Sequence, residues 1–206
     1  ACHFSTKCHG RNITSSELIM NYTYYEDFNK LCQLIVEDLL ENKIIGWFQG
    51  KSEFGPRALG NRSILANPII KDNKDYINER VKHREGWRPY APIMLEEYIH
   101  DWFDIPKNSS PYMLFNAQIL SEKEGQVPAV IHVDGSARIQ TVTEELNKPI
   151  FQLLTEWNKK TNVPILLNTS FNVDGEPIVE SPEDAIKTFM GTNIDVLVIG
   201  NYRVTK

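Results

Sequence analysis

Apolar residues recur at helical spacing in three segments, residues 26–42, 72–82 and 150–160. Intervals of three and four positions put such residues on one face of a helix, where they can be buried together. A fourth helix is predicted from Ser181 to about Met190, because Ser followed by Pro and two acids is typical of a helix N-terminus. The inward positions of the two clearest helices are Phe28, Leu31, Ile35 and Leu39, and Leu153, Leu154 and Trp157.

Short apolar or alternating runs predict strands along the chain. Residues 130–133 and 138–142 are expected to form a hairpin, because the turn sequence Asp134-Gly135-Ser136 separates them. Residues 88–95 carry two prolines and are therefore expected to be an edge strand or irregular chain. The remaining strand candidates are residues 43–48, 112–120, 164–167 and 195–199.

Helices and strands are mixed without strict alternation, which favours an α/β (α+β) fold with a twisted mixed β-sheet flanked by helices. Residues 1–25 are polar and aperiodic, so we expect a linker or lead-in there and one domain over residues 26–206. A chain of 206 residues, 41% apolar, can bury a sizeable core. Because the sequence begins with Ala rather than Met, we expect a processed protein or a piece of a longer one.

The chain carries 22 Lys and Arg against 27 Asp and Glu, a net charge of −5, which argues against nucleic acid or an anionic membrane as a partner. We find no signal peptide and no apolar run near the roughly 20 residues that span a bilayer. An odd number of cysteines fits a reducing cytoplasm better than a disulfide framework. Two pairs of residues resemble zinc ligands, but their short polar tail offers no supporting residues, and we predict no metal site; they are Cys2-His3 and Cys8-His9.

Three segments place cations beside glycine or small polar residues, a mixture that suits phosphate groups. FGPRALGNRS contains Arg57, VKHRE contains Lys82 and Arg84, and HVDGSAR ends in Arg138. Any one of these cations alone would more often lie on a solvated face. Three such segments in one acidic chain make a local anion site the better interpretation.

A fourth segment, LLNTSFNVDGEP, supplies Asn168, Ser170 and Asn172 directly after a predicted strand. Their hydroxyl and amide groups could bind phosphate or sugar, but an ordinary turn rich in Asn and Gly has the same pattern, and both readings stay open. His132 could be a general base or a packed histidine. The sequence has no Walker P-loop, GxSxG or HExxH motif, which disfavours the usual P-loop and hydrolase mechanisms.

Four motifs together resemble the C-terminal domain of NodU-type O-carbamoyltransferases over nearly everything from about Tyr24 to Val204. They are GWFQGKSEFGPRALGNRSILANP, VKHREGWRPYAP, HVDGSARIQTV and PILLNTSFNVDGEPIVESPEDA, in the order of the family. Within those enzymes the domain is similar to the YrdC fold of threonylcarbamoyl-adenylate synthases, whose hallmark is a K-x-R motif followed far downstream by S-x-N. Lys82-His83-Arg84 and Ser170-Phe171-Asn172 match the two halves.

The resemblance implies a domain that consumes carbamoyl phosphate and ATP, with Mg²⁺ travelling on the nucleotide, to make carbamoyl adenylate. An N-terminal metal-containing domain, which this sequence lacks, would then transfer the carbamoyl group to a hydroxyl. The departing pyrophosphate needs fixed cations, so we expect Lys82, Arg84 and Arg138 to hold carbamoyl phosphate and then the reacting phosphoryl groups. Four further residues would complete the site: Ser170 and Asn172 at the nucleotide phosphates, Asn168 at the carbamoyl amide and Arg57 closing it.

Three other functions stay open. The chain could be a non-catalytic module that binds a nucleotide or docks a partner. It could make threonylcarbamoyl adenylate from a different donor. It could bind RNA, although the net charge of −5 and the lack of interleaved basic and aromatic residues argue against that.

Overall fold

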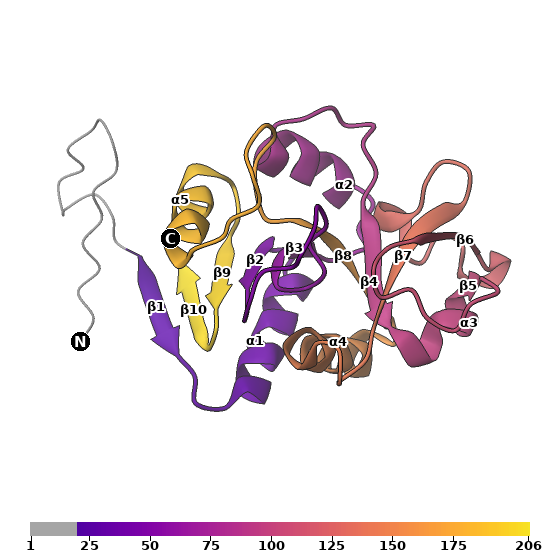
Figure 1. The fold of residues 1–206 in the computed structure, drawn as a ribbon, viewed down its shortest axis with the longest axis horizontal. Coiled ribbons are helices and arrows are strands. Elements are labelled where there is room, and N and C mark those ends of the chain that lie inside the picture. Colours follow the sequence, from indigo (N-terminus) through magenta and orange to yellow (C-terminus); the bar gives the residue numbers. More distant parts are fainter. Residues whose placement is uncertain (1–19) are drawn as a thin grey trace.

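The computed structural model describes residues 20–206, which form one sheet of ten strands in the order β1-β10-β9-β2-β3-β8-β4-β7-β6-β5 (Figure 1). Strand pairs β2–β9 and β4–β7 are parallel, and the other neighbours are antiparallel, so the predicted twisted mixed sheet is confirmed. The strands are β1 (Asn21–Tyr24), β2 (Ile45–Phe48), β3 (Arg62–Ala66), β4 (Ala91–Leu95), β5 (Phe103–Asp104), β6 (Phe115–Ile119), β7 (Ser136–Val142), β8 (Ile165–Ser170), β9 (Val196–Ile199) and β10 (Tyr202–Thr205).

The four predicted helical segments begin and end close to the predicted positions, whereas α3 was not predicted. α1 starts after Asp27, whose side chain accepts the N–H of Asn29, and α5 starts with a reciprocal cap between Ser181 and Asp184. The helices are α1 (Phe28–Leu40), α2 (Asn73–Tyr76), α3 (Ile99–Trp102), α4 (Lys148–Thr161) and α5 (Pro182–Gly191). A π-helical turn (Ile77–Lys82) extends α2, and 3₁₀ turns lie at Glu96–Tyr98, Ser121–Lys123 and Pro128–Val130.

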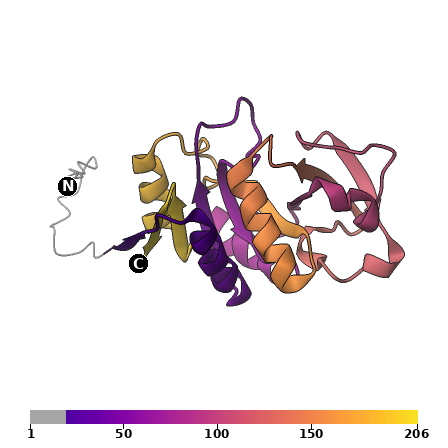
Figure 2. The same cartoon turned by 90° about the horizontal axis from the view of Figure 1, so that it is seen from below.

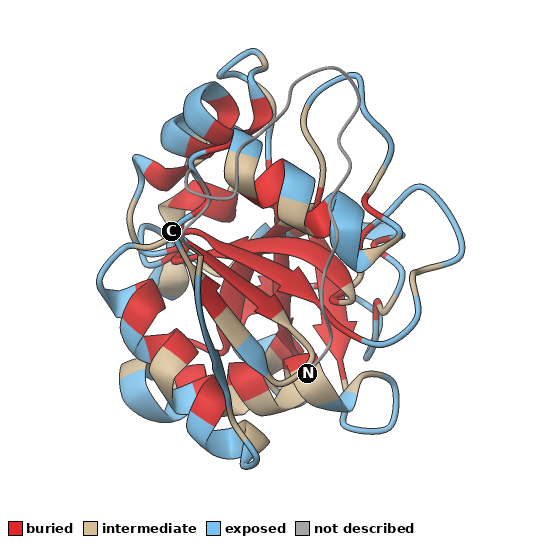
Figure 3. Cartoon of the chain, turned by 90° about the vertical axis from the view of Figure 1, so that its left-hand side faces the viewer, coloured by how far each residue is buried: buried red, intermediate tan, exposed pale blue. Residues whose placement is uncertain are grey.

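Helices cover both faces of the sheet and give the core two parts. α1 and α4 pack side by side on one face (Figure 2), and α5 and the segment 73–82 cover the other. The strands between them are buried, whereas the outer helix faces are exposed (Figure 3). The predicted inward residues are confirmed as buried except Phe28, which is half-buried; each fully buried large apolar side chain contributes about 1.5–3 kcal/mol.

The prediction that residues 88–95 form an edge strand or irregular chain was wrong. β4 lies inside the sheet, between β8 and β7. Pro92 stands opposite Leu167 of β8, and pairing with β7 begins one residue later, at Ile93. Because the proline precedes the stretch that pairs on both sides, the strand can run through the sheet interior despite the missing N–H.

The predicted hairpin between residues 130–133 and 138–142 was also wrong. Pro128–Val130 is a 3₁₀ turn, and β7 pairs with β6 and β4 instead. The turn signal itself is confirmed, because Gly135 has φ +79° and its N–H donates to His132 O. The turn at residues 134–136 was therefore predicted correctly, but the strand expected to pair with β7 was not.

The lead-in expected to reach Tyr25 is too long, because Asn21–Tyr24 form β1 against β10. β1 has only four residues, all of them exposed, which is too short a run to stand out from the polar segment before it. β3 and β10 were also not predicted, since each is short and contains an arginine. Residues 1–19, with the Cys2-His3 and Cys8-His9 pairs, lie outside the described residues.

Asp38 of α1 anchors β10 through a buried ion pair. Its carboxylate accepts Arg203 Nε and Nη2, both at 2.8 Å, and Lys43 Nζ at 2.9 Å. Burial works to raise the pKa of Asp38, but the hydrogen bonds from Arg203 and Lys43 outweigh it and hold the pKa below its usual value. The ionised carboxylate therefore stabilises the folded state.

We predict that Asp38→Asn lowers the free energy of unfolding by up to about 3 kcal/mol at pH 6, because it leaves partly buried cations without their counter-charge. The difference from the wild type should shrink below about pH 4, since a carboxylate with a depressed pKa loses its contribution as it becomes protonated. Urea unfolding at several pH values checks this. Glu79→Gln, which removes an exposed pairing with Arg80, is the control and should change little.

Candidate functional site

Lys82 joins the π-helical turn to the end of β8. Its Nζ lies 2.6 Å from Ser170 O, 3.2 Å from Ser170 Oγ, 2.9 Å from Asn172 O and 2.6 Å from Asn172 Oδ1. Ser170 Oγ also donates to Asn172 Oδ1 at 2.7 Å. The structure thus brings together two motifs that are 88 positions apart in the sequence.

The π-helical turn directs Lys82 to this place. It ends at His83, which has the left-handed φ of +55°. Lys82 O accepts the N–H of Asp174 at 2.9 Å, which ties the turn to the loop after β8. The sequence predicted an ordinary helix here, because the wider π turn leaves no periodic signal in so short a segment.

Lys82 as a residue is 3% exposed, and its amine has no carboxylate partner among the described residues. Burial, with a smaller contribution from the charge of Arg84, lowers the pKa of Lys82 to about 7 against the opposing effect of Asp174. At neutral pH the group is therefore divided between its charged and neutral forms. An anion bound nearby would favour the ammonium.

Arg84 lies close enough to Lys82 to affect its pKa but turns toward Asn78. Its Nε donates to Asn78 Oδ1 at 2.7 Å, and the guanidinium lies over the ring of Tyr90, 4.9 Å from the centroid. Within residues 20–206 its terminal nitrogens make no hydrogen bond or salt bridge. They remain available to a ligand.

The glycine-rich loop of residues 50–60 is held in shape by one carboxylate. Glu53 Oε1 accepts the backbone N–H groups of Leu59 at 2.6 Å and Asn61 at 2.8 Å. Gly60 has φ +105°, which strains any other residue, and a side chain there would press tightly against Ile150, so glycine is favoured. The loop therefore presents Arg57 from a defined backbone.

Arg62, the second arginine of the loop motif, is structural. Its buried guanidinium lies 3.6 Å from the centroid of the Phe48 ring and donates to Gln49 O at 2.8 Å and Gly50 O at 3.1 Å. It supports the loop from beneath and does not face a ligand.

Arg57 and Arg138 form a pair of neighbouring cations. Burial lowers the pKa of the half-buried Arg138, and the positive charge of the exposed Arg57 adds to that effect. Arg138 Nε is buried without a hydrogen-bond partner, and neither guanidinium forms a salt bridge with any residue from 20 to 206. Two adjacent, unpaired cations favour the binding of an anion.

Asn168 is 1% exposed and links β8 to the glycine-rich loop. Its Nδ2 donates to Ala58 O at 3.0 Å and to Gln140 Oε1 at 2.8 Å, whereas its Oδ1 is buried without a partner. Gln140 Nε2 in turn donates to Leu59 O at 2.8 Å. Asn168 therefore has a structural role, as well as a free acceptor that sequence could not reveal.

The sheet register places Asn168 and Arg138 on one face. Asn168 stands opposite Ala91, and Ile93 stands opposite Gln140, so the continued parallel register puts Ala91 beside Arg138. The side chains of such lateral neighbours point to the same side of a sheet. The Cα atoms of Asn168 and Arg138 are therefore roughly 10 Å apart, two strand spacings, with a small alanine between them.

Lys74 extends the cationic region, and its charge acts on the nearby His132. The half-buried His132 has Nδ1 3.3 Å from Ser136 Oγ. Burial lowers the pKa of His132, the charges of Arg138 and Lys74 lower it further, and Asp134 opposes them. The role of His132 as a general base stays a prediction. Lys74 was missed because a single lysine in a helix has no motif around it.

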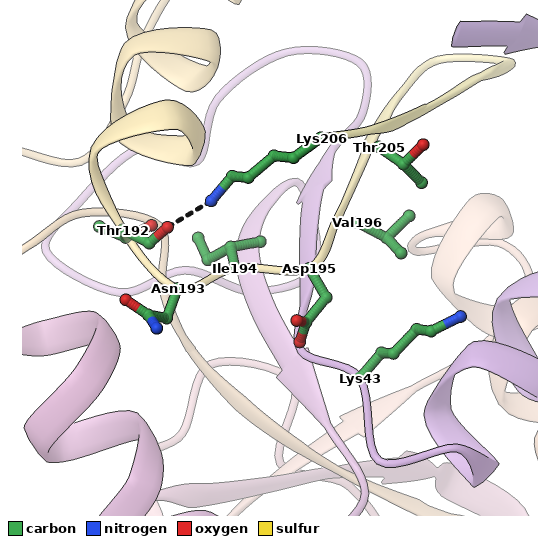
Figure 4. Close-up of a pocket in the computed structure, with 8 residues that line it drawn as sticks. All are labelled: Lys43, Thr192, Asn193, Ile194, Asp195, Val196, Thr205 and Lys206. Carbon is green, nitrogen blue, oxygen red and sulfur yellow. Dashed lines mark hydrogen bonds between the residues drawn. The ribbon is translucent and has the colours of Figure 1, made fainter. Parts of the chain in front are cut away.

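A cavity of about 560 Å³ lies elsewhere, beside the start of β9 and the end of β10 (Figure 4). Lys206 crosses it to donate to Thr192 O, and Asp195 accepts the N–H of Ile44 at 2.7 Å. Because these polar groups are used within the protein, we place the candidate site at the clustered motifs and not in this cavity.

Within residues 20–206 no three His, Cys, Asp or Glu side chains gather as metal ligands would. In the same part of the chain, no helix is long and apolar enough to cross a membrane.

Comparison with known proteins gives long matches. The sequence model of the family described as carbamoyltransferase C-terminus matches residues 36–206. The nodulation protein NolNO of Sinorhizobium fredii is 49% identical over 172 residues, 82% of this chain, and NolO of Bradyrhizobium diazoefficiens is 50% identical over 165 residues, 79% of it. The chain spans only 25% and 30% of the length of these relatives.

Solved structures with a similar fold share little sequence. Full-length HypF in a phosphate- and nucleotide-bound form superposes with a TM-score of 0.61 at 16% identity, over 83% of this chain and 25% of HypF. Sua5 of P. abyssi with L-threonine gives 0.61 at 13% identity, over 84% of this chain and 47% of Sua5. These likenesses show that the fold is YrdC-like, and the family match over residues 36–206 shows that the chain belongs to the carbamoyltransferase C-terminal family.

Proposed function

We propose that this domain binds carbamoyl phosphate and ATP and forms carbamoyl adenylate. In a longer enzyme, an N-terminal metal-containing domain would then transfer the carbamoyl group to a hydroxyl acceptor. The domain proposed for the first step comprises residues 26–206 together with β1, which pairs with β10.

One observation carries the proposal. Arg138 Nε and Asn168 Oδ1 are a buried donor and a buried acceptor, each without a partner among the described residues, on one face of the sheet. An unpaired buried polar group costs about 1–3 kcal/mol, so a pair of them favours a complementary ligand. Carbamoyl phosphate offers phosphate oxygens to Arg138 and an amide N–H to Asn168.

The chemistry needs positioning and positive charge more than a protein nucleophile. Water first cleaves carbamoyl phosphate to carbamate and phosphate; a carbamate oxygen then bonds to the α-phosphorus of ATP as the bond to the pyrophosphate oxygen breaks. Arg57 and Arg138 would hold the first phosphate, and Lys82 and Arg84 would stabilise charge on the departing pyrophosphate. Ser170 would orient the nucleotide phosphates together with Asn172.

Mg²⁺ would arrive with the nucleotide, and the carboxylates among residues 20–206 form no cluster that would hold it instead. HypF, which is similar in fold to this chain over 25% of its own length, has a phosphate- and nucleotide-bound structure, and this supports the choice of these two kinds of ligand.

We predict that the chain, given ATP, Mg²⁺ and carbamoyl phosphate, forms a product with the mass of carbamoyl adenylate and releases pyrophosphate. Arg138→Ala should slow product formation at least about tenfold, because the proposed charge-assisted contact between Arg138 and the phosphate of the substrate is lost. Arg80→Ala is the matched control, since Arg80 is exposed and pairs only with Glu79. Mass spectrometry and a pyrophosphate assay measure both.

Absence of product from the wild type, with ATP affinity unchanged in Lys82→Ala and Arg84→Ala, would overturn the proposed enzyme and its site. ATP binding without product would favour a nucleotide-binding module. Product only with threonine and bicarbonate would favour threonylcarbamoyl adenylate, and salt-sensitive RNA binding abolished by these substitutions would favour an RNA-binding domain.

Asn168 should set the preference for a carbamoyl group. We predict that the wild type binds carbamoyl phosphate at least about tenfold more tightly than acetyl phosphate, whose methyl group cannot donate to Oδ1. Asn168→Leu should lose this preference. Gln140→Leu, which disturbs the same network but keeps Asn168, should retain it. Calorimetry measures the affinities, and equal affinity of the wild type for both phosphates would contradict the assignment.

Binding of the nucleotide should draw a proton onto Lys82. Its pKa of about 7 leaves the amine mostly neutral at pH 8, and a nearby phosphate favours the charged form. Calorimetry of ATP binding at pH 8, in buffers that differ in ionisation enthalpy, should therefore show proton uptake. Lys82→Met should show less uptake, and equal uptake by both proteins would contradict the role of Lys82.

A further inference from the structure

Asn78 lies at the centre of a polar cluster beneath Arg84 and is 0% exposed. Its Oδ1 accepts Arg84 Nε at 2.7 Å and Tyr90 OH at 2.6 Å. Its Nδ2 donates to Gly86 O at 3.2 Å and Arg88 O at 3.1 Å. All four hydrogen-bonding positions of the carboxamide are thus used.

The backbone of Asn78 also contacts the segment that carries Arg84. Its carbonyl accepts the N–H of His83 and, at 2.9 Å, that of Arg84. This wide turn, with His83 at φ +55°, reverses the direction of the chain. Both the backbone N–H and the side chain of Arg84 therefore contact Asn78.

The hydrogen-bond partner of the Arg84 guanidinium is the neutral amide of Asn78, which leaves the positive charge of Arg84 without a counter-charge. A neutral oxygen fixes the guanidinium through Nε without cancelling its charge, whereas a carboxylate would form a salt bridge. Within residues 20–206 no acid pairs with Arg84, so both terminal nitrogens keep their donors.

We propose that Asn78 is the positioning residue of Arg84, holding its guanidinium oriented and uncompensated for a phosphate group. The inference rests on the proposed function and names the residue that prepares one of its cations. Tyr90 supports the arrangement from below, through its ring and its hydroxyl.

Asn78→Asp is the informative change, because it keeps the size and the acceptor but adds a negative charge beside Arg84. With inorganic pyrophosphate as the probe, we expect affinity to fall about ten- to hundredfold, as for the loss of a charge-assisted contact. The dependence of binding on salt should weaken with it.

Asn73→Asp is the matched control. Asn73 belongs to α2, is 1% exposed and donates to Asn67 O at 2.9 Å, with no contact to Arg84. Circular dichroism and thermal melts should show both variants folded and destabilised. Of the two variants, only Asn73→Asp should keep a pyrophosphate affinity within about twofold of the wild type.

A double-mutant cycle separates positioning from general damage. In an Arg84→Ala background, Asn78→Asp should weaken pyrophosphate binding no further, because the group it acts through is gone. A further loss there, equal weakening by Asn73→Asp, or a wild type that binds no pyrophosphate would each overturn the proposal.

Arg84→Lys decides the matter if Asn78→Asp does not fold. A lysine keeps the charge but lacks the planar fork that Asn78 holds at Nε while two other nitrogens face the anion, so the Arg84→Lys variant should bind pyrophosphate nearly as weakly as Arg84→Ala. Wild-type affinity in Arg84→Lys would overturn the proposal.

Failure here is distinguishable from failure of the proposed function. Carbamoyl adenylate formed by Asn78→Asp at the wild-type rate would remove the positioning role and leave the function. If pyrophosphate binding depends on Asn78 and Arg84 but the wild type forms no adenylate product, the positioning role stands and the proposed function is overturned.

Discussion

The buried amine of Lys82, surrounded by oxygens of Ser170 and Asn172, is the interaction on which the rest of the site depends. It joins the helical segment on one face of the sheet to the end of β8. Burying a charge is costly unless hydrogen bonds replace water, and here neutral carbonyl, hydroxyl and amide oxygens do so. The candidate site therefore holds an amine whose pKa is lowered to about 7, so that a bound anion would favour its charged form.

The other cations of the candidate site also lack a carboxylate partner within residues 20–206. Arg84 is held by an amide, and Arg138 has no partner at its Nε. Elsewhere among the described residues several cations form salt bridges, as Arg203 does with Asp38 and Lys159 does with Glu156. The protein has a net charge of −5, but no carboxylate pairs with Arg84 or Arg138 among the described residues. The region around them is therefore locally positive.

Sequence predicted much of the fold, because helix periodicity and caps are local signals. α1, α4 and the Ser181 start of α5 followed from spacing and capping residues. Strand partners did not, since β7 pairs with β6 and β4 across long separations, and nothing near Asp134 encodes that choice. β1 was not predicted because its four exposed residues are too short a run to stand out from the polar segment before it.

For the site, paired motifs located Lys82, Ser170 and Asn172 in one cluster before the fold was known. They could not show that Arg62 is structural or that Asn78 orients Arg84. Such roles depend on which atom a side chain contacts, and contacts across the sheet or around a π turn have no spacing in the sequence.

The most direct test of the proposed site is a crystal structure of the domain with carbamoyl phosphate and a non-hydrolysable ATP analogue. We predict phosphate oxygens on Arg57 and Arg138, the carbamoyl nitrogen within hydrogen-bond distance of Asn168 Oδ1, and the nucleotide phosphates beside Lys82 and Arg84. Carbamoyl phosphate bound away from Arg138 and Asn168, with both groups still unpaired, would contradict it.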